Sequence, residues 1–158
     1  MVRLVALLAL CAGAGIEGQT AARHEWKTYG NARFGYQICY PEDMFEPQGE
    51  AANGDGQTLL AKDGAKLTVY GRNNVLGQSP HEVMVDAAAR LGKASYRLVR
   101  PPGFVVSGSG KDGGKYYVKA VFSGEQLAVF EITYGAERAA VYKPVIERMA
   151  ACFEFAAK

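Results

Sequence analysis

Two neighbouring segments near the C-terminus are rich in branched and aromatic side chains, and they constrain the fold more than any other feature. Residues 115–122 and 126–134 both have the composition of a β-strand, and a short Ser-Gly-Glu turn separates them. Strands joined by so short a turn pair in antiparallel fashion. The sequence therefore predicts a long hairpin, and its expected inward-facing side chains are Tyr116, Val118, Ala120 and Phe122, and Ala128, Phe130, Ile132 and Tyr134.

Five more segments have the composition of strands and are bounded by proline, glycine or other turn residues. They are residues 34–40, 57–61, 66–71, 94–100 and 103–107. The second and third flank an Asp-Gly turn, which indicates another hairpin. Because short turns rather than crossover helices join the strands, we expect an antiparallel sheet.

Two segments have helical periodicity. The first begins at a capping box, in which Pro80 follows Ser79 and Glu82 stands three residues after the serine, and it ends before Gly92. The second covers residues 142–151, where a proline in the first turn limits where a regular helix begins. Together with the strands, these helices predict a single α+β domain over residues 23–158, an antiparallel sheet packed by two helices.

The first 22 residues have the pattern of a secretory signal peptide. A positive charge precedes nine apolar residues, a run too short to span a membrane, and the small residues that follow allow cleavage after Ala14 or after Ala22. Leu10 stands where lipoprotein processing requires a small residue, which argues against a lipid anchor at Cys11. With no other apolar run of transmembrane length, we expect a periplasmic or secreted bacterial protein.

Removal of the signal peptide leaves two cysteines, Cys39 and Cys152. An even number of cysteines in an oxidising compartment favours a disulfide. Neither residue belongs to a C-x-x-C pair or adjoins a histidine, as a reactive thiol often does. The sequence therefore predicts a Cys39–Cys152 disulfide that ties an early strand to the C-terminus.

The charges nearly cancel in total but are segregated along the chain. The 18 basic and 16 acidic residues give a net charge of +2, which provides no electrostatic case for binding nucleic acid. Residues 42–55 nevertheless contain five acids and no base, and residues 90–119 contain seven bases and one acid. Strand alternation puts Lys115, Tyr117 and Lys119 on one face of their strand, and Arg97 with Val99 on one face of an earlier strand. With Arg100, the charged residues and Tyr117 are the candidate surface for an anionic partner: Arg97, Arg100, Lys115, Tyr117 and Lys119. The alternative is a solvated outer face of the sheet.

Motifs for cofactors and metals are not supported by their context. Residues 108–113 read G-x-G-x-x-G, but a strand follows where a dinucleotide site needs a helix, so they indicate a hairpin turn. Residues 53–56 imitate part of a calcium loop, yet Lys62 falls at the position of the final acidic ligand. His24 and His81 lack the spacing of metal ligands. We therefore expect no cofactor and no metal.

One enzymatic alternative stays open, a small serine-type hydrolase. Such an enzyme needs a base held against a nucleophile. The candidates are Ser107 or Ser109 near the glycine-rich turn and His81 as the base.

The beginning of the mature chain resembles a known family. Residues 26–41 contain an N-x-R-F-G-aromatic strand that ends at Tyr-Pro, and this run is similar to the start of PsbP-like domains and their small bacterial secreted relatives. Residues 142–149, leading into Phe153, resemble the closing helix of that group. The resemblance implies an α/β sandwich and a non-catalytic accessory or binding module. From the signal peptide and the basic segment, we expect the partner to be an envelope protein or an anionic ligand. A purely structural envelope protein is the further alternative.

Overall fold

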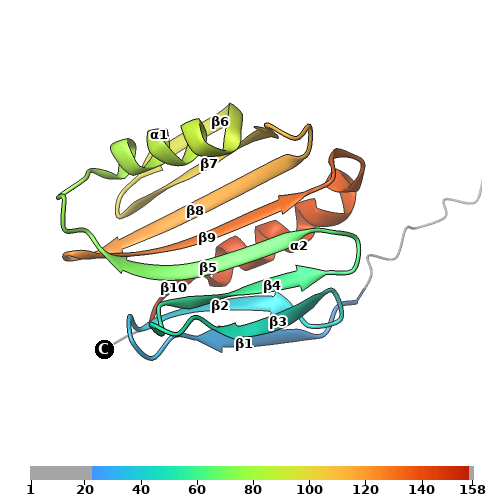
Figure 1. Cartoon of the computed structure of the whole chain (residues 1–158), viewed down its shortest axis with the longest axis horizontal. Coiled ribbons are helices and arrows are strands. Elements are labelled where there is room, and N and C mark those ends of the chain that lie inside the picture. Colours follow the sequence, from blue (N-terminus) through green and yellow to red (C-terminus); the bar gives the residue numbers. More distant parts are fainter. Residues whose placement is uncertain (1–22, 157–158) are drawn as a thin grey trace, which may run out of the picture.

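The computed structural model describes residues 23–156 (Figure 1). The predicted signal peptide, with Cys11 and both cleavage positions, lies outside this range. The described chain contains two α-helices, a short 3-10 helix and ten strands. In chain order the elements are β1 (Trp26–Gly30), β2 (Tyr36–Pro41), β3 (Phe45–Glu50), β4 (Gly56–Ala61), β5 (Lys66–Asn73), α1 (Pro80–Leu91), β6 (Gly92–Arg100), β7 (Gly103–Gly110), β8 (Lys115–Ser123), β9 (Gln126–Tyr134), η1 (Ala136–Arg138), α2 (Ala139–Cys152) and β10 (Glu154–Phe155).

The strands form two antiparallel sheets. The large sheet has seven strands in the order β3-β4-β5-β9-β8-β7-β6, and the small one has three in the order β1-β2-β10. The predicted hairpin is β8–β9, whose register runs from Ser123 opposite Gln126 to Lys115 opposite Tyr134. The α+β class, the antiparallel pairing and the two helices are therefore confirmed.

The prediction of one inward face for the hairpin is wrong, because the large sheet has a core on each side. Directly opposed residues of antiparallel strands share a face, and Val118 lies opposite Glu131 while Lys119 lies opposite Phe130. The two sets predicted to point inward therefore lie on opposite faces. Strand β9 is buried on both faces from Leu127 to Ile132, which explains why its sequence is an almost continuous apolar run.

Each helix covers one face of the large sheet. Helix α1 packs on β6, β7 and β8 and buries Val83, Met84, Ala87 and Ala88 against Phe104, Val106, Tyr116 and Val118. Helix α2 and strand β2 cover the other face, where Tyr142, Val145, Ile146 and Met149 meet Leu59, Leu67, Phe130 and Ile132.

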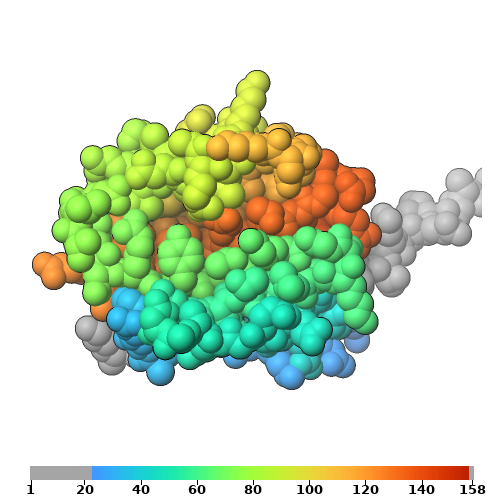
Figure 2. Space-filling view, in the orientation of Figure 1, coloured from blue at the N-terminus to red at the C-terminus, as the bar shows by residue number. Residues whose placement is uncertain are grey.

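The two helices are offset, since α1 lies over β6, β7 and β8 on one face, whereas the core under α2 on the other face reaches from β4 to β8. Figure 2 shows the α1 side, where β4 and β5 lie at the surface beside the helix. On the face turned away from α1, the end of α2 contacts β8, and β6 and β7 extend beyond it to the edge of the sheet.

The ends of several elements differ from the predictions. Helix α2 begins at Ala139, five residues before Pro144. A proline inside a helix removes one backbone hydrogen bond, and the carbonyl that loses it belongs to Ala140, which is exposed to solvent. Strands β1, β3 and β10 were not predicted, because β1 and β3 are mostly exposed, β3 contains Pro47 and β10 has only two residues.

Candidate functional site

The structure divides the five residues of the predicted anionic-partner surface between two faces. Lys115, Tyr117 and Lys119 alternate along β8 on the face turned away from α1, and Arg100 joins them through its pairing with Gly103. Arg97 lies opposite Val106, which packs against α1, so its side chain leaves from the other face. Four of the five residues therefore share the face on which the end of α2 contacts β8.

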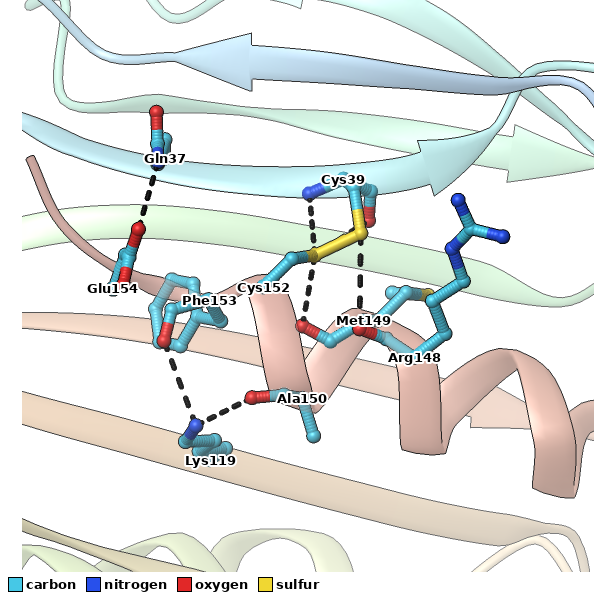
Figure 3. The surroundings of a disulfide bond; sticks show 9 residues. All are labelled: Gln37, Cys39, Lys119, Arg148, Met149, Ala150, Cys152, Phe153 and Glu154. Carbon is cyan, nitrogen blue, oxygen red and sulfur yellow. Dashed lines mark hydrogen bonds between the residues drawn. A yellow bond between two sulfur atoms is a disulfide. The ribbon is translucent and has the colours of Figure 1, made fainter.

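Lys119 is engaged with the end of α2. Its Nζ donates to the carbonyl oxygen of Ala150 at 2.5 Å and lies 3.5 Å from that of Phe153 (Figure 3). The side chain is half-buried, and this burial lowers the pKa of its ammonium group. A cation at the C-terminal end of a helix also interacts favourably with the helix dipole. Lys119 therefore serves first to hold the end of α2 on the sheet.

Two further residues of the predicted surface have internal partners. The ring of Tyr117 stacks on Phe130 with 5.5 Å between centroids, and burial raises the pKa of its hydroxyl to about 12. The Nζ of Lys115 lies 3.2 Å from the Oγ of Ser109 on the neighbouring strand. Of the five residues, only Arg97 and Arg100 are exposed and without a side-chain hydrogen-bond partner within residues 23–156.

A groove of about 310 Å³ lies on this face of the sheet, next to the end of α2. Its walls are mostly apolar, and two cationic side chains reach it, Arg100 and Lys119. Leu98 and Val105 come from the sheet, and Phe153 closes the groove from the segment after α2. The groove thus combines apolar walls with positive charge, as a site for an amphipathic anionic group requires.

Two exposed apolar residues beside the groove were not predicted as site residues. Tyr96 is 50% exposed and Leu98 is 41% exposed, and both lie on the same face as Arg100. Tyr96, Leu98 and Arg100 stand two residues apart in a predicted strand, and this spacing alone indicates that their side chains share a face. We call the surface formed by Tyr96, Leu98, Arg100, Val105, Tyr117 and Lys119 the β6–β8 face.

The expected disulfide is present between Cys39 and Cys152, whose Cα atoms are 5.9 Å apart. It joins β2 of the small sheet to the last turn of α2 (Figure 3). Gln37 reinforces the same junction by donating from Nε2 to Oε1 of Glu154 at 2.9 Å. The end of α2 is therefore held by a covalent bond on one side and by Lys119 on the other.

The family-like motif near the N-terminus has a structural role. Asn31 is buried, and its Nδ2 donates to the hydroxyl of Tyr29 and to the carbonyl oxygen of Gly54, each at 3.0 Å. Its Oδ1 accepts from the backbone N–H of Phe34 at 2.9 Å. Gly35 follows with φ of +71°, a conformation that favours glycine. The motif builds the turn between β1 and β2 and fixes it to the loop between β3 and β4.

The acidic stretch has local partners. The carboxylate of Glu42 pairs with Lys27, and that of Asp43 lies 2.8 Å from Nδ1 of His24. The hydroxyl of Tyr29 donates to Oε1 of Glu50 at 2.6 Å. Much of this negative charge therefore helps to attach β1 and the residues before it to β2, β3 and the turn between them.

The hydrolase alternative lacks its geometry. Ser107 and Ser109 lie opposite Tyr117 and Lys115, so their side chains leave from the face turned away from α1. His81 is exposed in the first turn of α1, on the opposite face of the sheet. A base and a nucleophile must lie within hydrogen-bond reach, and here the sheet separates them.

The predicted hairpin turn joins β7 and β8, but it is shorter than residues 108–113, because residues 108–110 belong to β7 and the turn covers residues 111–114. Within residues 23–156, no three His, Cys, Asp or Glu side chains gather as a metal site requires. No helix in the same range has the length and apolar character needed to cross a membrane.

No family model matches the sequence, and no curated protein matches it. The solution structure of cyanobacterial PsbP (CyanoP) from Synechocystis sp. PCC 6803 is similar, with a TM-score of 0.56 over 90% of this chain and 98% of that chain, at 14% sequence identity. This chain has the PsbP-like fold. The PsbP-like fold predicted from residues 26–41 and 142–149 is therefore confirmed. The shared architecture carries no site residue from PsbP to this chain, and the β6–β8 face is described from its own side chains.

Proposed function

We propose that this protein is a non-catalytic accessory module that binds an anionic partner in the periplasm or outside the cell. The observation that carries the proposal is the β6–β8 face, where Tyr96 and Leu98 are exposed beside Arg100 on the edge strand β6, beyond the end of α2. Contiguous exposed apolar residues with charged neighbours are typical of interaction sites.

Three further observations support the proposal. The disulfide fits an oxidising compartment, as the predicted signal peptide does. The PsbP-like fold favours an accessory role over catalysis. Helices on opposite faces of the large sheet are consistent with the α/β sandwich that the resemblance implies. The partner would be an envelope protein or an anionic ligand of the same compartment.

Site-specific photo-cross-linking tests the proposal. A benzoylphenylalanine replaces Leu98 on the β6–β8 face or, as a matched control, Leu60, which is 43% exposed on the other face. We expect position 98 to give a discrete adduct in an envelope fraction, and excess unlabelled protein should compete it away. Excess protein carrying Arg100→Glu should compete less well. Equal adducts from positions 98 and 60, or none from 98, would count against the proposal.

A further inference from the structure

Strand β6 ends the large sheet, and one of its edges is unpaired within residues 23–156. The strand has nine residues, and it pairs with β7 on one side only. In Figure 1 it lies at the upper border of the molecule, next to α1. Such an edge presents a row of free backbone N–H and C=O groups, which accept another strand unless the protein blocks them.

The two edges of the large sheet differ in how they are protected. Strand β3, at the opposite edge, contains Pro47 and a register shift between Pro47 and Glu50, and it exposes no large apolar residue. Strand β6 also has a register shift, between Ala94 and Tyr96, but its pairing with β7 is regular from Tyr96 to Arg100 and it contains no proline. It exposes Tyr96, Leu98 and Val99, of which the last is 40% exposed on the α1 face. Apolar side chains on both faces of an edge strand provide cross-strand contacts for an added strand.

The charge of β6 restricts which strand it accepts. Lys93, Arg97 and Arg100 are exposed, and the strand contains no acid. None of the three forms an ion pair within the described part of the chain. Pairing two copies of β6 would place cations opposite or beside cations, which is destabilising. A segment with acids at matching positions would instead neutralise them.

We propose that β6 binds an extended acidic segment of a partner polypeptide, which adds to the large sheet as an eighth strand. This inference rests on the proposed function and names the chemistry of its partner. Backbone hydrogen bonds would supply affinity, and the alternating side chains would supply specificity. In an antiparallel arrangement, the segment carries acids opposite Arg100 and Arg97 and apolar residues opposite Val99, Leu98 and Tyr96. Read from its N-terminus, the best match is Glu-Val-Ile-Glu-Val.

The probe is a fluorescent peptide, Thr-Glu-Val-Ile-Glu-Val-Thr with blocked ends, whose binding is followed by fluorescence anisotropy. Two control peptides separate the contributions: one has lysine in place of both glutamates, and the other carries N-methyl groups on alternate amides. We expect both controls to bind at least about tenfold more weakly. Hydrogen exchange should show slower exchange of β6 amides when the acidic peptide is bound.

Protein variants test the charge argument. Arg97→Glu combined with Arg100→Glu should weaken binding by about tenfold or more. Lys62→Glu combined with Lys66→Glu changes the net charge equally on exposed residues away from β6 and should leave binding unchanged. Equal losses in both double variants would overturn the inference, because they would indicate an effect of net charge alone.

Other results also decide between occupants. If the N-methylated peptide binds as tightly as the unmodified acidic peptide, the peptide lies on the β6–β8 face and not along the unpaired edge of β6. If sedimentation shows a dimer with protected β6 amides in the absence of peptide, the occupant is a second copy of the chain. If no peptide binds while position 98 still gives its adduct, this inference fails and the proposed function stands. If no peptide binds and position 98 gives no adduct, both this inference and the proposed function are overturned.

Discussion

The Nζ of Lys119 lies 2.5 Å from the carbonyl oxygen of Ala150, so a central strand of the large sheet provides the cation at the C-terminal end of α2. The same helix end is bonded through Cys152 to β2 of the small sheet. Both sheets therefore meet at the last turn of one helix, and the stability of the domain should respond to changes there.

Replacing Lys119 by methionine keeps the apolar stem and removes the charge. We expect the free energy of unfolding to fall by about 1 kcal/mol, since the carbonyls of Ala150 and Phe153 lose their donor and the helix end loses its cation. Urea denaturation of the oxidised protein measures the change. Lys115→Met is the matched control on the same strand and face, and we expect it to cost less. Equal losses would show that the contact with α2 contributes nothing specific.

Reduction of the disulfide should lower stability more than any single substitution on the surface. The two cysteines are 113 residues apart, and for a loop of this length the chain-entropy model gives about 4 to 5 kcal/mol. Denaturant unfolding with and without reductant measures the effect, and a variant carrying Cys39→Ala and Cys152→Ala should not respond to reductant. A count of two free thiols in the untreated mature protein would contradict both the disulfide and the oxidising compartment.

Two buried tyrosines should respond in opposite ways to the loss of their hydroxyl groups. The hydroxyl of Tyr142 donates to Oδ1 of Asp63 at 2.9 Å, so Tyr142→Phe should cost about 1 kcal/mol. The hydroxyl of Tyr116 is buried without a hydrogen-bond partner among the described residues. Tyr116→Phe should therefore leave the Tm unchanged or raise it. Thermal unfolding measures both variants, and a clear loss in Tyr116→Phe would show that its hydroxyl has a partner.

Acid should weaken the attachment of α2 at Asp63. Burial alone raises the pKa of this carboxyl, but hydrogen bonds from Tyr142, the Ala65 N–H and Arg138 together hold it below its ordinary value of 3.8. When the pKa of a carboxyl is lower in the folded state than in the unfolded state, its full stabilising effect is present at pH values well above 3.8. This stabilisation is lost as the pH falls through the folded-state pKa. Measurements of Tm against pH should show a shallower acid slope in Asp63→Asn. An acid slope in Asp63→Asn equal to that of the wild type would contradict this account.

Local signals were sufficient for much of the fold. Helix α1 was predicted with nearly its observed ends because Ser79 and Glu82 form both hydrogen bonds of the capping box and Gly92 follows the last turn. The β8–β9 hairpin followed from two segments of strand composition and the short turn between them. The orientation of the hairpin side chains could not be predicted in the same way. Both faces of the hairpin are buried, so the sequence of the two strands does not show which face α1 covers and which face α2 covers.

The candidate site was harder to predict, because it depends on contacts between segments distant in sequence. Nothing in residues 115–119 shows that the end of α2, more than thirty residues later, will cover Lys119. Arg97 and Arg100 are three residues apart on one strand, so alternation alone places them on opposite faces. The exposure of Tyr96 and Leu98 follows from β6 being an edge strand, and strand order is a property of the whole chain.

The bond between Cys39 and Cys152 also changes how the domain would respond to proteolysis. These residues lie near the two ends of the folded region, so most of its loops fall between them. A protease that cuts one such loop produces two fragments that remain covalently joined. Both cores then keep all of their strands and helices, and release of either fragment requires a second cut or a reductant.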